Sequence, residues 1–282
     1  MINAATSKKY AVFKRLHESG CFVIPNPWNA GSARYLQGLG FKALATTSSG
    51  HAHSLGFADG EQSVDEVLAH FSEIAGVTDV PVNADFENGY SDDPDRMAEN
   101  VTRCITTGVA GLSIEDFTGD ESDPLYDFDL AVARVKATRS AIDKAGGGVL
   151  FTARTEGFIH NRPDLDETIR RLKAFADAGA DCLYSPGIKT REQIEATVKA
   201  VAPKPINFLN HGAFGFTVQD LAAMGVRRIS VGGTLARVAM HAFVKSAREI
   251  ATDGKFDSFA GTMPNAELNK FFHDDFAKRP KP

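Results

Sequence analysis

Short apolar runs alternate with longer amphipathic segments along most of the chain. Eight of these runs are brief, rich in β-branched or small apolar residues, and mostly without a polar alternation. Such runs are typical of strands that are covered on both faces, as in a parallel sheet. We therefore predict strands at residues 22–24, 42–45, 81–84, 111–115, 149–153, 181–184, 205–209 and 227–231.

The segments between the predicted strands have the end signals of helices. Ser63 precedes a stretch with acidic residues in its first turn, and Asp93-Pro94 opens a segment that stops at Gly108. These are the N-cap, first-turn and C-terminal preferences of α-helices. We predict helices at about residues 4–19, 29–40, 63–77, 93–108, 127–145, 163–178, 190–201, 217–224 and 235–252.

Eight strands that are each followed by a helix predict an α/β fold, a closed (β/α)8 barrel of the TIM type, with an extra N-terminal helix. The alternative is an open doubly wound sheet, which normally carries GxGxxG after its first strand. Here the first strand runs into PNPW, residues 25–28. No linker rich in Pro, Gly or Ser divides the chain, so we predict one domain over residues 1–282. Its tail, about 254–282, packs on its own or a neighbouring subunit.

Composition and charge narrow the function classes. The chain has 282 residues, 43% of them hydrophobic, and 31 basic against 36 acidic side chains give a net charge of −5. Disorder is excluded, and nucleic acid or an anionic membrane is not expected as a partner. Cys21, Cys104 and Cys182 form no CxxC pair and are expected to be small buried residues in a reducing compartment. Without a signal-peptide core or a membrane-length apolar run, we expect a cytoplasmic protein.

The third and fourth predicted strands end in carboxylates. Residues two apart on a strand share a face, so Asn83, Asp85 and Glu87 point the same way, as do Ser113 and Glu115. The C-terminal ends of the strands form the active site of such a barrel. Clustered carboxylates are costly to desolvate unless a cation lies among them. Their oxygen donors suit Mg2+, with Mn2+ as a substitute, so Asp85, Glu87 and Glu115 are the predicted metal ligands.

Arg154, at the end of the fifth strand, offers a planar fork for a carboxylate or phosphoryl group. A metal together with an arginine indicates an anionic bidentate substrate such as a 2-oxo acid. Ser48, Ser49 and Gly50 follow the second strand and by themselves are typical of a turn, and Asp59 lies in the next loop. The sequence does not identify the general acid or base. The candidates near strand ends are Tyr90, Glu156, Tyr184, Asn210 and His211.

Six motifs in the same order resemble the isocitrate lyase / phosphoenolpyruvate mutase superfamily. They are NPWNAGSARYLQGLGFKALATTSSG, SLGFADG, PVNADFENGY, GLSIEDFTGD, FTARTEGF and MGVRRISVGG. The similarity runs from about Phe22 to Ile250 and is greatest to short bacterial members described as carboxyphosphonoenolpyruvate mutase-like or phosphonomutase-like. The resemblance implies a Mg2+-dependent barrel enzyme that acts on 2-oxo or 2-hydroxy acids.

The resemblance also implies roles for single residues. Asp85 corresponds to the aspartate that binds the metal directly, while Glu87 and Glu115 hold it through waters and Asp59 lies nearby. The pair Ser49-Gly50 contacts the substrate carboxylate. The expected site is therefore catalytic Arg154, Glu115 and Asp59; substrate-binding Ser48, Ser49, Gly50, Arg154 and Asn210; and metal-binding Asp85, Glu87 and Glu115. Family members usually form tetramers that exchange the last helix, so a homo-oligomer is expected, either a tetramer or a dimer with a swapped C-terminal helix.

The loop after the fourth strand departs from the family pattern. Isocitrate and methylisocitrate lyases carry a catalytic cysteine there, within Lys-Lys/Arg-Cys-Gly-His. Here residues 117–127 read FTGDESDPLYD, without Cys, Lys or His. Those activities are therefore not expected, and the Asn- or Lys-bearing gating loop of the mutases is absent too.

The sequence is compatible with three candidate functions. The leading hypothesis is a Mg2+-dependent lyase or hydrolase that cleaves a C–C bond in a small 2-oxo or 2-hydroxy dicarboxylate through an enolate, with oxaloacetate decarboxylation as the minimal case. The first alternative is a phosphonopyruvate- or phosphoenolpyruvate-type mutase or hydrolase, which the acidic Asp120, Glu121 and Asp123 disfavour by repulsion of a phosphoryl group. The second alternative is a barrel that binds a metabolite without catalysis.

Overall fold

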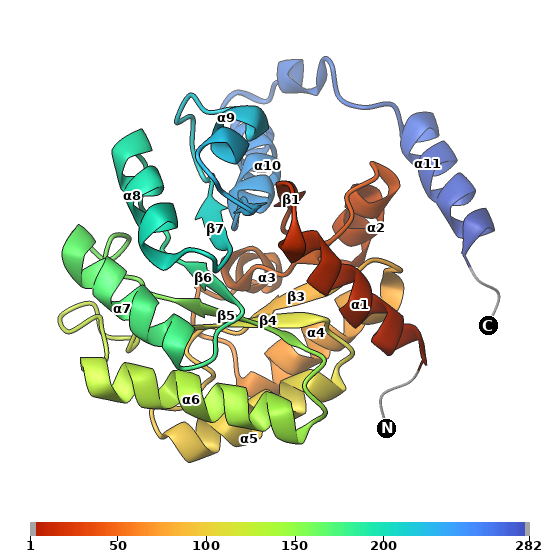
Figure 1. Cartoon of the computed structure of the whole chain (residues 1–282). Helices are drawn as coiled ribbons and strands as arrows, with labels where there is room; N and C mark the ends of the chain where they lie inside the picture. Colours follow the sequence, from red (N-terminus) through yellow and green to blue (C-terminus); the bar gives the residue numbers. More distant parts are fainter. Residues whose placement is uncertain (1–3, 280–282) are drawn as a thin grey trace.

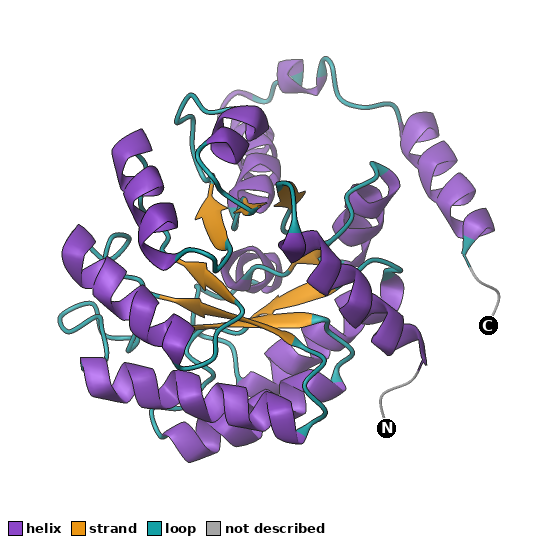
Figure 2. Ribbon diagram, in the orientation of Figure 1, coloured by secondary structure: helices purple, strands orange, loops and turns teal. Residues whose placement is uncertain are grey.

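The computed structural model describes residues 4–279. Eight parallel strands form one sheet in the order β1-β8-β7-β6-β5-β4-β3-β2, with helices around its outside (Figures 1 and 2). The strands are β1 Phe22–Ile24, β2 Leu44–Ala45, β3 Val82–Asp85, β4 Gly111–Glu115, β5 Leu150–Arg154, β6 Cys182–Tyr184, β7 Ile206–Leu209 and β8 Arg228–Ser230. All eight lie where the sequence predicts them, and β1 and β4 have the predicted bounds.

The barrel is nearly closed. Among the described residues no strand ladder joins β1 to β2, the two ends of the strand order. Two hydrogen bonds cross this seam instead: the Ala45 amide donates to the Pro25 carbonyl at 3.1 Å, and Asn26 Nδ2 donates to the Thr46 carbonyl at 2.8 Å. Proline cannot donate to a ladder, so the PNPW segment after β1 shortens the strand pairing here. The predicted α/β barrel is confirmed in this nearly closed form.

The helices follow the predicted alternation, and α3 and α11 are additional to the nine predicted ranges. They are α1 Ala4–Glu18, α2 Ala30–Gly38, α3 Ser48–Leu55, α4 Val64–Val77, α5 Pro94–Thr106, α6 Phe128–Lys144, α7 Leu165–Asp177, α8 Arg191–Val201, α9 Val218–Ala223, α10 Thr234–Asp253 and α11 Asn265–Lys278. The expected turn at Ser48-Ser49-Gly50 is wrong, because these residues are the first turn of α3. Thr47 caps that helix through its side chain, which accepts from the Gly50 amide at 3.3 Å.

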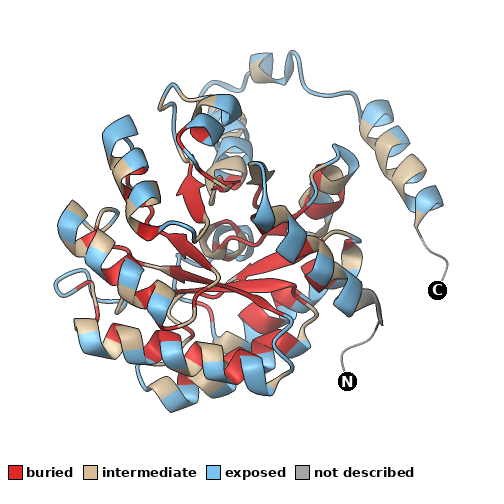
Figure 3. Cartoon of the chain, in the orientation of Figure 1, coloured by how far each residue is buried: buried red, intermediate tan, exposed pale blue. Residues whose placement is uncertain are grey.

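Two kinds of interior are present. The apolar core lies between the strands and the surrounding helices and is the buried layer of Figure 3. The middle of the barrel itself is polar, whereas Val, Ile and Leu fill most barrels of this type. Its buried polar side chains, each at most 4% exposed, include Asn83, Ser113, Thr152, Asn207 and Arg228. Helix α1 covers the N-terminal end of the barrel, where Phe13 packs against Gly111.

The C-terminal segment departs from this compact arrangement. Helix α11 lies beside α2 at the outer edge of the molecule, after a long connection from α10 (Figure 1). Arg34 pairs with Asp275, and Phe271 packs on Tyr35 with ring centroids 4.4 Å apart, yet no residue of α11 is buried. In the single chain α11 therefore contacts α2, and helix exchange is not shown.

Two further expectations concern cysteines and membranes. All three cysteines are free; Cys104 and Cys182 are buried as expected, whereas Cys21 is only half-buried because it lies in the loop before β1. None of the helices in the described part of the chain is long and apolar enough to cross a membrane.

Candidate functional site

A polar cavity of about 150 Å3 opens at the C-terminal ends of the strands and extends down the barrel axis. Its upper walls carry Asp85 of β3, Arg154 of β5 and Tyr184 of β6. Its floor includes Asn83 and Arg228, each two residues before a wall position on its own strand. Because alternate residues of a strand share a face, both layers point into the barrel.

Arg154 is the centre of the upper layer. Its Nη1 lies 2.6 Å from Asp85 Oδ1 and 3.0 Å from Glu115 Oε2, and its Nε lies 2.9 Å from Glu156 Oε1. Its guanidinium also covers the Tyr184 ring, 4.8 Å from the centroid. Burial opposes its charge, but the carboxylates, Glu115 first, raise the pKa of Arg154 well above the ordinary value. Arg154 is therefore a permanent cation held among three carboxyl groups.

The acidic side chains around Arg154 outnumber the positive charges near them. Burial raises the pKa of Glu115 well above its ordinary value, and Arg154 only partly offsets this. Burial, then the charges of Asp85 and Asp59, raise the pKa of Glu87 to about 7. Burial likewise raises the pKa of Asp59, while a hydrogen bond from Ser48 acts in the opposite direction. One further cation would relieve this repulsion.

The carboxylate oxygens of this site fit a divalent metal that takes few direct ligands from the protein. Within residues 4–279, no group of three His, Cys, Asp or Glu side chains converges to hold a metal by itself. Asp85 lines the cavity, whereas Glu115 is engaged with Arg154. Mg2+ commonly keeps several waters and binds through one or two carboxylates and substrate oxygens. Asp85 would thus be the direct ligand, with Glu87 and Glu115 acting through waters.

Helix α3 brings its first residues to the cavity wall. The Ser48 amide donates to Asp85 Oδ2 at 3.3 Å, and the Ser48 side chain bonds to Asp59. The Asp85 amide in turn donates to Thr46 Oγ1 at 2.9 Å, which fixes the carboxylate at the end of β3. The N-terminus of a helix attracts negative charge, so this turn is suited to a carboxylate ligand.

The structure brings most of the predicted residues together. Five of them line the cavity: Ser48, Ser49, Asp59, Asp85 and Arg154. Glu115 contacts Arg154, and Glu87 accepts a hydrogen bond from Tyr90 beside the cavity. Asn210 is not among the lining residues; its backbone amide donates to the Ser230 carbonyl at 2.9 Å, which continues the pairing of β7 with β8 beyond Leu209.

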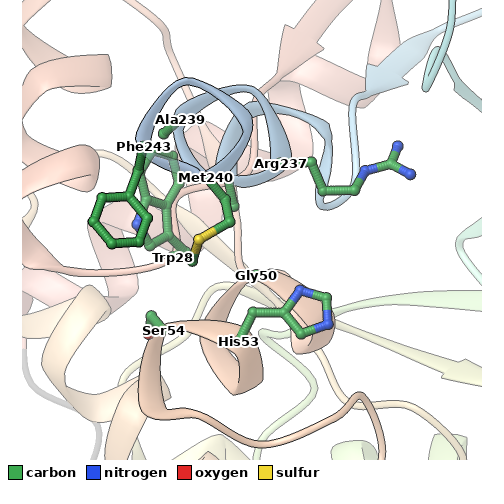
Figure 4. A pocket seen from close by; sticks show the side chains of 9 residues that line it. Trp28, Gly50, His53, Ser54, Arg237, Ala239, Met240 and Phe243 are labelled. Carbon is green, nitrogen blue, oxygen red and sulfur yellow. The ribbon is translucent and has the colours of Figure 1, made fainter. Parts of the chain in front are cut away.

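Gly50 faces a second pocket on the other side of α3. This pocket has a volume of about 440 Å3, is mostly apolar, and lies between α3 and α10 (Figure 4). Trp28, Met240 and Phe243 gather on its α10 side, and His53 and Ser54 project from α3 (Figure 4). A Cβ at Gly50 would lie 3.1 Å from Ala236 Cβ and 3.2 Å from Trp28 Cβ, so Gly50 lets α3 pack closely against α10 and Trp28.

The loop at residues 117–127 is attached to the loop after β5. Phe117 stacks on His160 with centroids 3.9 Å apart, and His160 Nδ1 lies 3.1 Å from the Glu121 carboxylate. Phe117 also pairs with Leu125 in an antiparallel bridge. At the base of the loop, the Glu156 amide donates to Asp116 Oδ1 at 2.8 Å. These contacts place the acidic loop beside the mouth of the barrel.

Sequence reasoning missed the contribution of β7 and β8. Asn207, Arg228, Ser230, Gly232 and Gly233 all line the cavity. The available signal was the polar residues at a spacing of two, as in Arg228-Ile229-Ser230, because alternate residues of a strand face the interior of a closed barrel.

The sequence of the chain matches one protein family over most of its length. The family model for phosphoenolpyruvate phosphomutase covers residues 13–251. An uncharacterized protein of Mycobacterium tuberculosis strain H37Rv is 31% identical over 258 residues, which is 91% of this chain and 94% of that protein. Oxaloacetate decarboxylase of Paraburkholderia xenovorans is 29% identical over 204 residues, 70% of this chain and 67% of that enzyme.

Solved structures agree with this match. A provisionally named lyase/mutase from Burkholderia cenocepacia J2315 is 41% identical, with a TM-score of 0.91 over 96% of this chain and 97% of that one. The structure of 2,3-dimethylmalate lyase, a member of the PEP mutase/isocitrate lyase superfamily, is 26% identical, with a TM-score of 0.83 over 98% and 97% of the two chains.

Proposed function

The chain belongs to the PEP mutase/isocitrate lyase superfamily, and from that premise we propose that it is a Mg2+-dependent lyase or hydrolase. Its substrate would be a small 2-oxo or 2-hydroxy dicarboxylate, in which it cleaves a C–C bond with an enolate as the leaving fragment. The observation that carries this proposal is the setting of Arg154, a buried cation among carboxylates in a polar cavity at the strand ends.

Arg154 and the start of α3 would bind the carboxylate end of the substrate. The guanidinium offers paired N–H donors, and the first turn of α3 brings Ser48 and Ser49 to the same wall. For this, the substrate must displace one of the carboxylates that Arg154 now contacts. Asp85 is the one that leaves most readily, because a bound cation would take over its charge.

Asp85 would hold Mg2+ directly, with Glu87, Glu115 and Asp59 around it. The ion would supply Lewis-acid stabilisation of the negative charge that develops on the 2-oxygen. Tyr184 and the Glu156 carboxylate lie beside Arg154 and keep water away from its buried face. Asp59 and Arg154 line the cavity and Glu115 contacts Arg154, so these three remain the proposed catalytic residues.

Cleavage of a C–C bond is favoured over phosphoryl chemistry. Asp120, Glu121 and Asp123 lie in the loop at the barrel mouth, where a phosphoryl group would meet a repulsive field. The superfamily includes 2,3-dimethylmalate lyase and oxaloacetate decarboxylase among the proteins similar to this chain. Oxaloacetate is therefore the first substrate to test, and a 2-hydroxy dicarboxylate such as dimethylmalate is the second.

The test compares the intact protein with Asp85→Ala on oxaloacetate, dimethylmalate and phosphonopyruvate, with Mg2+ and with a chelator. We expect Mg2+-dependent release of pyruvate, together with CO2 from oxaloacetate or with propionate from dimethylmalate, and a loss of at least about 1,000-fold in Asp85→Ala. Asp129→Ala, an exposed carboxylate of α6, is the control and should behave as the wild type. Release of phosphate from phosphonopyruvate, or full activity of Asp85→Ala, would contradict the proposal.

We also propose that the protein is a homo-oligomer in which residues 254–282 pack on a neighbouring subunit. Large exposed apolar side chains are concentrated on α10 and the segment after it, including Val238, Phe243, Phe256 and Phe276. Large apolar side chains left exposed in such number on one part of a chain favour an interaction site. Sedimentation of the full chain and of a chain ending at residue 253 tests this: the full chain should be a tetramer or dimer, and the shortened chain a smaller species. A monomeric full chain would contradict it.

A further inference from the structure

The floor of the polar cavity holds a second arginine. Arg228 is the first residue of β8, is 3% exposed, and lines the same cavity as Arg154. Its Nε donates to Asn207 Oδ1 at 2.8 Å, and its Nη1 lies 3.4 Å from His17 Nε2 and 3.5 Å from Asn83 Oδ1. Every one of these partners is a neutral side chain.

Arg228 differs from the other buried arginines. Arg34 pairs with Asp275, and Arg171 pairs with Asp116. Arg134 donates to the backbone carbonyls of a single loop, after β3. In the described part of the chain, Arg228 alone of these four buried arginines both borders a cavity and has no ion pair.

His17 does not supply the missing negative charge. Its Nδ1 lies 2.8 Å from the Phe13 carbonyl, so this nitrogen carries the proton and Nε2 accepts from Arg228. Burial, then the charge of Arg228, lowers the pKa of His17 to about 3, which keeps the ring neutral. An uncompensated buried cation is costly, and an anion in the cavity would neutralise it.

The two arginines are placed to receive the two ends of one molecule. On β3, Asn83 lies beside Arg228 and Asp85 beside Arg154, and two residues of a strand span about 6.6 Å. The cavity that both arginines line has a volume of about 150 Å3. A four-carbon acid with a carboxylate at each end bridges a gap of this size. Outside the mouth, a second carboxylate would instead face the acidic loop.

We propose that the cavity floor is a subsite for the second carboxylate of the substrate, and that Arg228 binds it. Asn207 and His17 act as positioning residues, because each holds one edge of the guanidinium. This inference rests on the proposed function, in which the first carboxylate is bound by Arg154. It adds that a residue inside the barrel, Arg228, makes the enzyme prefer dicarboxylates to monocarboxylates. The loop at residues 117–127 does not provide this specificity.

The test uses two 2-hydroxy acids that differ only in the second carboxylate, (S)-malate and (S)-lactate. Calorimetric titrations in saturating Mg2+ are made with the full-length wild type, Arg228→Met and Arg228→Lys. We expect wild type to bind malate at least about tenfold more tightly than lactate, since a charge-assisted hydrogen bond contributes that much. Arg228→Met should lose this preference while its lactate affinity stays within about twofold. Arg228→Lys should keep part of it.

Arg227→Met is the matched control, because this neighbouring arginine bonds to the Gly20 carbonyl on the outside of the barrel. It should retain the malate preference. Equal preferences in wild type and Arg228→Met would overturn the role of Arg228 while leaving the proposed function intact. A wild type that binds neither acid with Mg2+ would overturn both. Should Arg228→Met not fold, a wild-type structure with Mg2+ and malate decides: the second carboxylate beside Arg228 supports the subsite, and its placement toward residues 117–127 overturns it.

Discussion

The two hollows on either side of α3 differ in almost every property. The cavity on the barrel axis is small and polar, and ionised groups such as Arg154 and Asp85 contact one another across it. The pocket between α3 and α10 is about three times larger, at about 440 against 150 Å3, and is mostly apolar. Phe243, on its rim, is 65% exposed.

This difference indicates separate roles: the cavity on the barrel axis suits catalysis, and the pocket between α3 and α10 suits contact with a protein. Groups on the barrel axis are fixed by strands, and their charges are arranged around a space that a small anion and a cation would share. Groups around the α10 pocket present mostly apolar area, with polar side chains only at His53, Ser54 and Arg237 of its lining, which suits protein contact better than catalysis. Helix α3 contributes to both, so changes on its two faces should have different consequences.

The largest expected effect comes from removing the central cation. Arg154→Met leaves the carboxylates of Asp85, Glu115 and Glu156 facing one another without their partner. In metal-free buffer at pH 8, the free energy of unfolding should fall by about 3–5 kcal/mol, because a buried pair has lost one member. Urea denaturation measures this, and turnover should be lost as well.

The loss in Arg154→Met should shrink toward pH 5. Glu115 and Glu156 have folded-state pKa values raised by burial, so their destabilising charge is present at high pH and disappears as they protonate. Arg191→Met is the control, since its pair with Glu195 is half exposed; it should change stability by less than about 0.5 kcal/mol. A variant Arg154→Met as stable as the wild type at pH 8 would show that the carboxylates are not an uncompensated cluster.

A smaller effect is expected at Gly50, in the first turn of α3. A Cβ added by Gly50→Ala would lie 2.7 Å from Thr47 Cγ2, on the cap of α3, and press on Trp28 and Ala236. Overpacking of this kind costs about 1–3 kcal/mol in unfolding free energy. Because α3 also carries Ser48 and Ser49, substrate affinity should fall with stability.

Gly76→Ala is the matched comparison for Gly50→Ala. Gly76 lies in α4, and nothing approaches within 4 Å of a Cβ there. Alanine should therefore stabilise the protein by about 0.5–1 kcal/mol through helix propensity. Thermal and urea unfolding of both variants measures the contrast. If both substitutions stabilise equally, α3 is not clamped between the hollows.

The smallest effect at neutral pH is expected at the contact between α3 and α4. His51 stacks on His70 of α4 with centroids 3.6 Å apart, and His70 is buried with neither ring nitrogen hydrogen-bonded within residues 4–279. Burial, then the nearby His51, lowers the pKa of His70 to about 3. At pH 7.5, His70→Phe should change the free energy of unfolding by less than about 1 kcal/mol, because an apolar ring fits the neutral site.

Acid separates His70→Phe from the wild type. A folded pKa below the unfolded value near 6.5 means that the stability from neutral His70 is present above pH 6.5 and lost as the pH falls toward 3. Relative to His70→Phe, the wild type should lose about 1.4 kcal/mol per pH unit below about 6. Urea titrations at pH 7.5, 6 and 5 measure this, with His273→Phe on the exposed face of α11 as control. Parallel pH profiles for wild type and His70→Phe would contradict it.

Much of the barrel was predictable because its signals are local. Short unalternating apolar runs mark strands covered on both faces, and caps such as Ser63 and Asp93 mark helix starts in both sequence and structure. Helix α3 was missed because Ser and Gly favour turns locally. The capping bond from the Gly50 amide to Thr47 and the burial of Ala52 override that preference.

The sequence by itself determined which strands end in polar groups, and so placed Asp59, Asp85, Glu115 and Arg154 at one end of the barrel. Only the tertiary structure decided their partners. Strand order and register bring Arg154 of β5 to Asp85 of β3 and Arg228 of β8 to Asn207 of β7, and leave Asn210 outside the cavity. The physical reason is that alternation along a strand defines a face, whereas the distance across a barrel depends on how all eight strands close.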